Sequence, residues 1–155
     1  MLEKFLPTSP RFATAALAFA LALPAGSALA QSMVSVRPQS IHMRDGPGTR
    51  HDALWLVSRG YPLKVVGRKG NWLKVRDFEG DGGWVSRPLT STTPYHIVKV
   101  SKANLRSGPG TSFRIKGSVQ YGETLRTLQK KDGWVKVRHD TIGQGWISRK
   151  LVWGW

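Results

Sequence analysis

A tandem repeat constrains the fold of this chain more than any other feature of its sequence. When Arg44 is placed on Arg106, a constant offset of 62 residues aligns the two halves without a gap, and about 18 of 47 positions are identical. Solenoid repeats run about 20–50 residues, whereas a unit of this length is large enough for a small domain with its own core. We therefore predict two domains, at residues 34–90 and 96–153, joined by the short linker "TSTTP" (90–94).

Each unit consists of short runs that alternate apolar and polar residues, separated by turn-forming segments. "HIVKV" and "WVKVR" alternate in this way, and "KGN", "KDG", "GDGG" and "GQG" interrupt the runs. A period of two is typical of strands with one buried face, and several short strands at close spacing indicate a small barrel or sandwich. The fold class that we predict is all-β, with one helical turn in "WISRKL" (146–151).

The repeated Gly-Pro-Gly segment predicts a tight turn in each domain. Proline fixes φ for the first central position of a turn, and the following glycine accepts a positive φ without steric cost. We expect Met43 and Leu105, just before the segments, to anchor these loops in the core, and the segments themselves to be scaffold. The predicted turn residues are Gly46, Pro47, Gly48, Gly108, Pro109 and Gly110.

Three segments together resemble a known family. Asn-Leu-Arg-Ser-Gly-Pro-Gly-Thr (104–111), Gly-Trp-Val-Lys-Val (133–137) and Gly-Trp-Ile-Ser (145–148) are similar to the bacterial SH3 domain, SH3b. The first copy departs at two positions, with His42 in place of Asn104 and Asn71 in place of Gly133. The resemblance implies two tandem SH3-like β-barrels of five to seven strands. It also implies binding to peptidoglycan, often to its peptide stems, although a fold alone does not fix a ligand.

The tryptophan–cation phrases are the main candidates for ligand binding. If Val135 and Val137 face the core, then Trp134, Lys136 and Arg138 share the opposite face. By the same alternation Trp72, Lys74 and Arg76 share one face in the first copy. An aromatic ring beside two cations suits a peptide or sugar that carries carboxylates. The alternative is that each tryptophan packs under a neighbouring loop with its N–H satisfied.

Further candidates are Arg44 and Arg106, which lead the repeated turns, and two aromatic residues that differ between the copies. A guanidinium matches a carboxylate bidentately, but it serves equally well as a brace for loop carbonyls. Trp55 occurs only in the first copy and Tyr121 only in the second, so they can tune a groove differently in each. Trp84 and Trp146 are interpreted as structural, and the terminal "LVWGW" as a cover for a barrel end or a contact site.

Residues 1–30 are typical of a secretory signal peptide. A charged start precedes the apolar run "FATAALAFALAL", and Ala28-Leu29-Ala30 offers a cleavage site after Ala30. An uncleaved anchor is the alternative, and no later stretch is apolar enough to span a membrane. We predict export to the periplasm or the medium.

Composition narrows the choice of function. Beyond Ala30 there are 22 Lys and Arg against 8 Asp and Glu, a net charge of +14, and there is no cysteine. The positive charge favours polyanionic partners, although we expect no specific recognition of nucleic acid. The alternative is a basic surface that only keeps the protein in solution. No metal-ligand spacing, nucleophile motif or cofactor loop is present, and the two units occupy almost the whole chain, so we expect no enzyme, no metal and no cofactor.

The sequence thus predicts an exported, non-catalytic protein that binds cell-wall material, with peptidoglycan peptide stems as the favoured ligand. Two sites in tandem gain avidity on a repetitive polymer if both can engage at once. Two alternatives stay open. One is a periplasmic adaptor that holds a protein partner such as a wall hydrolase, and the other is a general polyanion binder.

Overall fold

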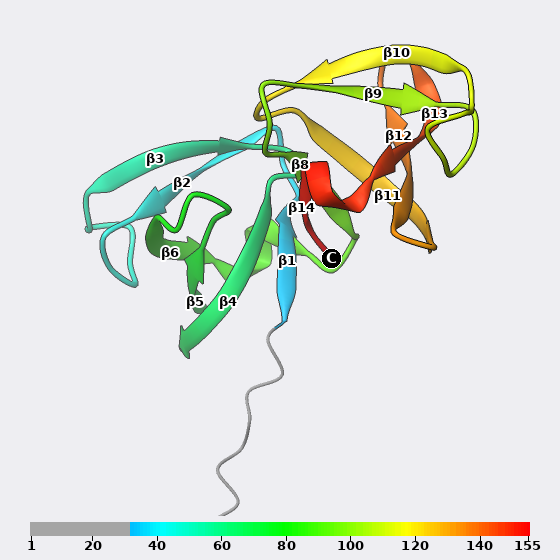
Figure 1. Ribbon diagram of the computed structural model, residues 1–155. Helices are drawn as coiled ribbons and strands as arrows, with labels where there is room; N and C mark the ends of the chain where they lie inside the picture. Colours follow the sequence, from blue (N-terminus) through cyan, green and yellow to red (C-terminus); the bar gives the residue numbers. More distant parts are fainter. Residues whose placement is uncertain (1–31) are drawn as a thin grey trace, which may run out of the picture.

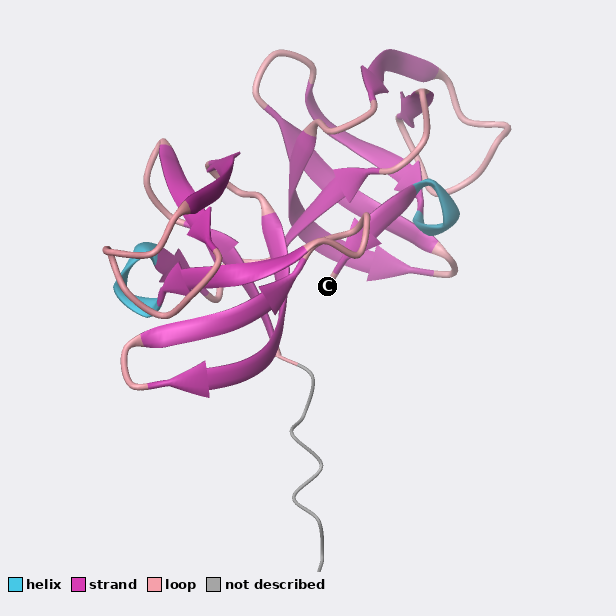
Figure 2. Cartoon of the chain, turned by 90° about the vertical axis from the view of Figure 1, so that its left-hand side faces the viewer, coloured by secondary structure: helices cyan, strands magenta, loops and turns pink. Residues whose placement is uncertain are grey.

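The computed structural model describes residues 32–155 and is built almost entirely of β-strands (Figures 1 and 2). The predicted signal peptide lies outside the described residues. The first sheet has the order β3-β2-β6-β5-β4-β1-β7, and the second has the order β10-β9-β13-β12-β11-β8-β14. The two orders correspond strand for strand, so the sequence repeat is also a repeat of topology.

The strands of the first sheet are β1 (Met33–Val36), β2 (Ser40–Arg44), β3 (Ala53–Ser58), β4 (Pro62–Lys69), β5 (Trp72–Arg76), β6 (Gly82–Ser86) and β7 (Thr90–Ser91). Those of the second are β8 (Tyr95–Val98), β9 (Lys102–Arg106), β10 (Ile115–Gln120), β11 (Thr124–Lys131), β12 (Trp134–His139), β13 (Gly143–Ser148) and β14 (Val152–Gly154). A 3-10 turn follows β6 at Arg87–Leu89 and β13 at Arg149–Leu151, and the second lies in the predicted helical turn. The all-β prediction is confirmed, and closure of each sheet into a barrel stays a prediction.

Each sheet has its own apolar core. The core is formed by the inward-facing residues, which alternate with outward-facing ones along each strand. Leu63 and Val75 in the first domain match Leu125 and Val137 in the second. All four are fully buried. Because the inward positions are mostly apolar, the alternation in the sequence defines which side chains remain available on the surface.

The Gly-Pro-Gly segments form tight turns, but their glycines serve a different purpose from the one predicted. The N–H of Gly48 donates to the carbonyl of Gly46 (3.0 Å), and Gly110 donates to Gly108 in the same way (3.0 Å). Neither Gly48 nor Gly110 has a positive φ. Instead, a Cβ on Gly46 would overlap the ring of His51, and one on Gly108 would overlap the corresponding ring of Phe113. Glycine is needed there for close approach.

Met43 and Leu105 are fully buried, as predicted, and anchor these loops in the two cores.

The predicted linker is partly strand and is bonded to both domains. Thr90–Ser91 is β7 and pairs with β1. The hydroxyl of Ser35 in the first domain donates to the carbonyl of Thr93 (2.8 Å), while the N–H of Thr127 in the second donates to the carbonyl of Pro94 (3.0 Å). The connection therefore holds the domains close together, as Figures 1 and 2 show.

Side chains also pack directly across the junction. The ring of Tyr121 lies 5.4 Å from that of Phe78, and the Tyr121 hydroxyl donates to Glu79. The hydroxyl of Thr124 donates to the carbonyl of Arg59 (3.3 Å). In addition, β8 and β14 of the second domain contact β4 of the first. Clefts lined by residues of both domains remain beside these contacts.

Candidate functional site

The outer face of the first sheet brings the predicted residues together. Leu73 and Val75 of β5 are buried, which leaves Trp72, Lys74 and Arg76 on the opposite face, as the sequence predicts. Lys74 lies directly opposite Trp84 of β6, and Trp84 lies directly opposite Arg44 of β2. Opposed residues on neighbouring strands have Cβ atoms about 5 Å apart. The result is a Lys–Trp–Arg row across three strands, with Trp72 beside it.

The second sheet repeats the strand register, but Trp146 is buried (9% exposed), whereas its counterpart Trp84 is partly exposed. Lys136 lies opposite Trp146, and Trp146 lies opposite Arg106. Trp134 and Arg138 flank Lys136 on the same strand, and the intervening valines are fully buried. We call these two surfaces the outer faces. Each is defined by Trp72, Lys74, Arg76, Trp84 and Arg44 in the first domain and by Trp134, Lys136, Arg138, Trp146 and Arg106 in the second.

The two tryptophans of the repeated phrase are not fully packed into their domains. Trp72 and Trp134 are both partly exposed at the start of their strands. Within residues 32–155, neither indole N–H donates a hydrogen bond to a protein group. A tryptophan that serves packing alone usually has its N–H satisfied when it is buried. Trp72 and Trp134 are only partly buried, so an unpaired N–H does not contradict a candidate role in binding, which stays a prediction.

Arg44 and Arg106 brace the turn loops. Nη1 of Arg44 donates to the carbonyl of His51 (2.7 Å). Nη1 of Arg106 donates to the carbonyls of Thr111 (2.8 Å) and Phe113 (2.9 Å). The scaffold role considered from the sequence is therefore present in both domains. It occupies one nitrogen of each guanidinium, and among the described residues the other N–H groups have no side-chain or backbone acceptor.

Trp55 and Tyr121 lie apart from the outer faces. Trp55 is half exposed on β3, the edge strand of its sheet, between Leu54 and the two-thirds exposed Leu56. Tyr121 packs at the domain junction against Phe78. Its hydrogen bond to Glu79 raises the pKa of the Tyr121 hydroxyl. These two residues are not part of the outer faces, and their role in ligand binding stays a prediction.

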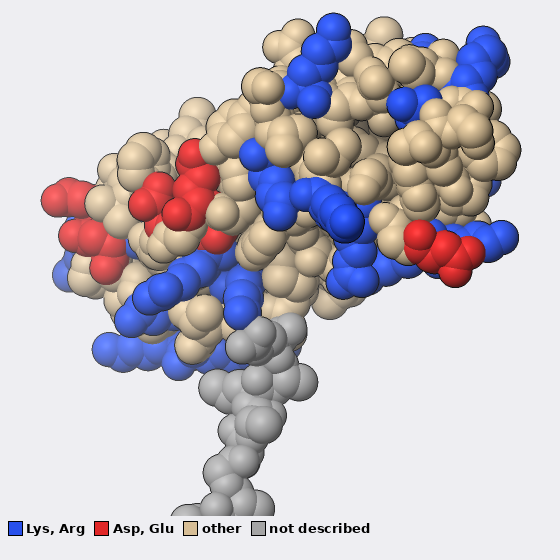
Figure 3. Space-filling view, viewed as in Figure 1, with Lys and Arg blue, Asp and Glu red and all other residues tan. Residues whose placement is uncertain are grey.

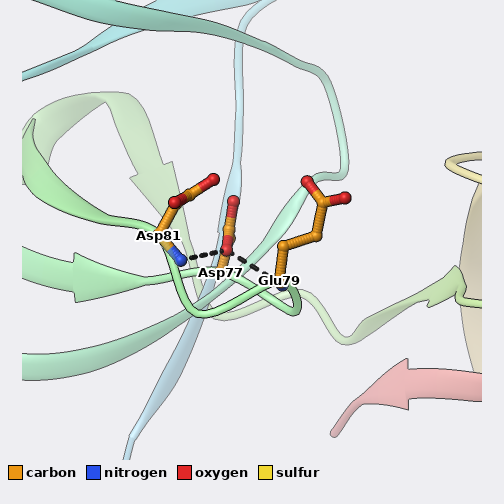
Figure 4. Close-up of side chains that lie close together, drawn as sticks. All are labelled: Asp77, Glu79 and Asp81. Atoms are coloured by element: carbon orange, nitrogen blue, oxygen red, sulfur yellow. Dashed lines mark hydrogen bonds between the residues drawn. The ribbon is translucent and has the colours of Figure 1, made fainter.

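Three carboxylates gather in the loop between β5 and β6 (Figure 4). Oxygens of Asp77, Glu79 and Asp81 come within 4.8 Å of one another. Asp77, however, accepts the backbone N–H groups of Glu79 (3.0 Å) and Asp81 (2.8 Å) and the hydroxyl of Tyr61 (3.3 Å). The buried carboxylate is thus already satisfied, and its contacts shape the loop. Burial and the neighbouring Asp77 raise the pKa of Tyr61.

One histidine is buried as a neutral group. His96 on β8 is 1% exposed, and its Nδ1 lies 2.6 Å from the hydroxyl of Thr127. Burial, with a smaller repulsion from Lys130, lowers the pKa of His96 to about 4. The residue belongs to the scaffold of the second domain and couples its stability to pH.

Basic side chains spread over both domains on the face seen in Figure 3, while acidic ones collect in a few places. Within residues 32–155 the only acid–base pairs closer than 4 Å involve His51 and His139, and none involves a lysine or arginine. The excess cations therefore face solvent without local neutralisation.

Sequence reasoning missed two groups of residues. Trp84 is one: the buried Val85 beside it indicates that Trp84 faces outward, whereas its counterpart Trp146 is buried, in keeping with a structural role. The second group lies at the domain junction, where Arg59 comes near Tyr95 and Arg126. No pattern in the sequence indicates this meeting, because it depends on how the two domains pack.

Comparison with protein families agrees with the topology. Two models, each described as a bacterial SH3 domain, match residues 38–92 and 101–152. The chain belongs to the bacterial SH3 domain family. Its two SH3 domains lie in tandem, one on each seven-stranded sheet.

The SH3 chain is similar to parts of longer proteins. It is 26% identical over 141 residues to the "Putative N-acetylmuramoyl-L-alanine amidase YrvJ" of Bacillus subtilis, a match that covers 79% of this chain and 26% of that protein. Among solved structures, NlpC1 from Trichomonas vaginalis is 16% identical (TM-score 0.34; 79% of this chain and 45% of that one). An NlpC/P60 family protein from Bacillus cereus is 18% identical (TM-score 0.34; 80% and 56%).

The SH3 chain thus spans about a quarter of the curated relative and about half of the solved chains. Among the described residues, no helix is long and apolar enough to cross a membrane.

Proposed function

We propose that this protein is an exported, non-catalytic binding protein whose two SH3 domains hold cell-wall peptidoglycan through their peptide stems. The observation that carries the proposal is the outer face, where a partly exposed tryptophan lies beside a Lys–Trp–Arg row in both domains. Membership of the bacterial SH3 family and the amidase-named relative support a wall ligand. The location that follows is the periplasm or the cell exterior.

The chemistry of the outer face fits such a ligand. Stem peptides carry carboxylates and present backbone amides, and they recur along a polymer. The cations supply charge complementarity, the indole rings supply apolar area at low entropic cost, and the free indole N–H supplies a directional bond. Two moderate sites on one polymer raise the overall affinity, because the second binding event is intramolecular.

Retention on purified peptidoglycan sacculi tests the proposal. Wild-type protein is expected to sediment with sacculi, and the Trp72→Ala/Trp134→Ala variant to remain in the supernatant. The matched control is Trp55→Ala, which removes a half-exposed tryptophan away from the outer faces. Circular dichroism of each variant checks that the sheets are intact. Equal retention of wild type and the double variant would show that the outer faces do not bind the wall.

A second candidate function is favoured by one observation. The edge strand β3 carries Leu54, Trp55 and Leu56, all exposed, next to unpaired backbone groups. Such an edge can take an extended segment of a protein partner as an added strand. A stoichiometric complex with a wall hydrolase, lost on Leu56→Lys and unaffected by sacculi, would favour this adaptor role.

A further inference from the structure

A cleft at the domain junction gathers arginines from both domains. It has a volume of about 380 Å³ and is lined by Gln39, Ser58, Arg59, Tyr95, Thr124, Arg126, Arg138 and Asp140. A smaller cleft of about 240 Å³ shares Arg59, Tyr95 and Arg126 with it and adds Arg37. A volume of 380 Å³ has room for about a dozen water molecules. A ligand larger than a single inorganic ion therefore fits.

The sheet register places like charges side by side in this cleft. Arg126 on β11 lies directly opposite Arg138 on β12, and on its other side it lies opposite Tyr95 of β8. Like charges directly opposite on a sheet are destabilising. Both side chains are exposed, and within residues 32–155 neither makes a hydrogen bond or an ion pair with another side chain. Neither arginine is paired with an acid among the described residues, although one carboxylate, that of Asp140, lines the same cleft.

The first domain adds a third cation at the same place. Arg59 is exposed and sits at the junction, where its carbonyl accepts the hydroxyl of Thr124 (3.3 Å). Its guanidinium has no protein partner among the described residues. Three arginines, two from one domain and one from the other, thus line one cleft. Each of them offers paired N–H donors that match a carboxylate.

The remaining lining residues indicate which anion fits. Hydroxyl groups of Ser58, Thr124 and Tyr95 are suited to further oxygen atoms or amides. Asp140 adds one carboxylate to the same wall. An acid repels a compact phosphate, but it suits the ammonium or amide N–H of a molecule that also carries carboxylates. A short peptide has both kinds of group.

We propose that the junction cleft binds a carboxylate-bearing peptide, held by Arg59, Arg126 and Arg138. The choice of a peptide rests on the proposed wall-binding function, whereas the need for an anion rests on the excess of three unpaired arginines over one acid in the cleft lining. Because Arg59 belongs to one domain and Arg126 to the other, the bound peptide also fastens the two domains to each other. The cleft begins where the outer face of the second domain ends, at Arg138, so one polymer can contact both.

Isothermal titration calorimetry of the full chain tests this inference. The probes are the tripeptide alanyl-γ-glutamyl-lysine with free carboxylates, the same tripeptide with its carboxylates amidated, and inorganic phosphate. The variant is Arg59→Gln/Arg126→Gln, which leaves all outer-face residues in place. The matched control is Arg68→Gln/Arg114→Gln, which also removes one exposed arginine from each domain but none from the cleft.

The wild type and the matched control are expected to bind the free tripeptide equally, and the cleft variant at least about tenfold more weakly, the equivalent of one lost charge-assisted hydrogen bond. The amidated tripeptide is expected to bind the wild type no more tightly than it binds the cleft variant. Tighter binding of phosphate than of the tripeptide would overturn the peptide assignment. No binding, or equal losses in both variants, would overturn the site.

The result separates this inference from the proposed function. Sedimentation with sacculi reports on Trp72 and Trp134, whereas the calorimetric difference reports on Arg59 and Arg126. Failure of one experiment leaves the other outcome intact. The cleft variant should also be at least as resistant to heat as wild type in the absence of ligand, because it relieves repulsion between Arg126 and Arg138.

Discussion

Substituting alanine for Gly60 tests the packing of one domain against the other. Gly60 is buried with φ +78°, and a Cβ placed there would lie 2.6 Å from the Tyr95 ring of the second domain. That is about 1 Å closer than an optimal carbon–carbon contact. The repeat supplies a matched control, because Gly122 stands 62 residues later with φ +81° and nothing within 4 Å of its Cβ position.

The two variants share the backbone cost and differ in the clash. A non-glycine residue in the left-handed region costs about 1–2 kcal/mol in either domain. Forcing a Cβ against the Tyr95 ring adds about 1–3 kcal/mol, the range for overpacking. The free energy of unfolding should therefore fall by about 1–2 kcal/mol for Gly122→Ala and by about 2–5 kcal/mol for Gly60→Ala.

Urea denaturation followed by tryptophan fluorescence measures both changes under identical conditions. The double variant Gly60→Ala/Tyr95→Ala removes the obstructing ring, so the excess loss should shrink toward the value for Gly122→Ala, apart from the cost of the lost ring contacts. Equal losses in the two single variants would refute the docked arrangement of the domains, and with it the junction cleft.

Three further outcomes follow from the contacts described above. The free energy of unfolding should fall as pH drops from about 6.5 to about 4, because the unfolded state binds a proton on His96 that the folded state, with the pKa of His96 lowered to about 4, does not bind. The loss approaches about 3 kcal/mol. It should vanish in His96→Gln, as acid titration of unfolding would show. Arg106→Ala should destabilise the second domain by about 1–3 kcal/mol in thermal unfolding, because two loop carbonyls lose a charged donor. Gly108→Ala should destabilise it too, and Gly108→Ala/Phe113→Ala should recover part of the loss in the same assay, because Phe113 supplies the ring that a Cβ would meet.

Much of the fold could be predicted from the sequence because its signals are local. Alternation in the segment "WVKVR" predicts that Val135 and Val137 face inward, and both are fully buried. The same alternation predicts the outer-face positions of Trp134 and Lys136. The 62-residue offset then transfers each assignment to the other domain.

The parts that could not be predicted depend on contacts between distant segments. The glycine after proline is predicted to take a positive φ, yet Gly48 does not. The first glycine, Gly46, is the one that is needed, because the ring of His51 folds back onto it. Pairing of Trp84 with Arg44 requires the β2–β6 register, which no local pattern specifies. The meeting of Arg59 with Arg126 depends on packing between domains, and so it is visible only in the structure.

The central claim is that the outer faces recognise the wall and do not act through net charge alone. The most direct measurement is the salt dependence of binding to purified sacculi, compared with binding to heparin as a polyanion of unrelated structure. Heparin binding is expected to collapse between low and roughly physiological salt. Sacculus binding should largely persist over the same range and be lost in Trp72→Ala/Trp134→Ala. Parallel collapse on both polymers, with no effect of the double variant, would contradict the account and leave a general polyanion binder.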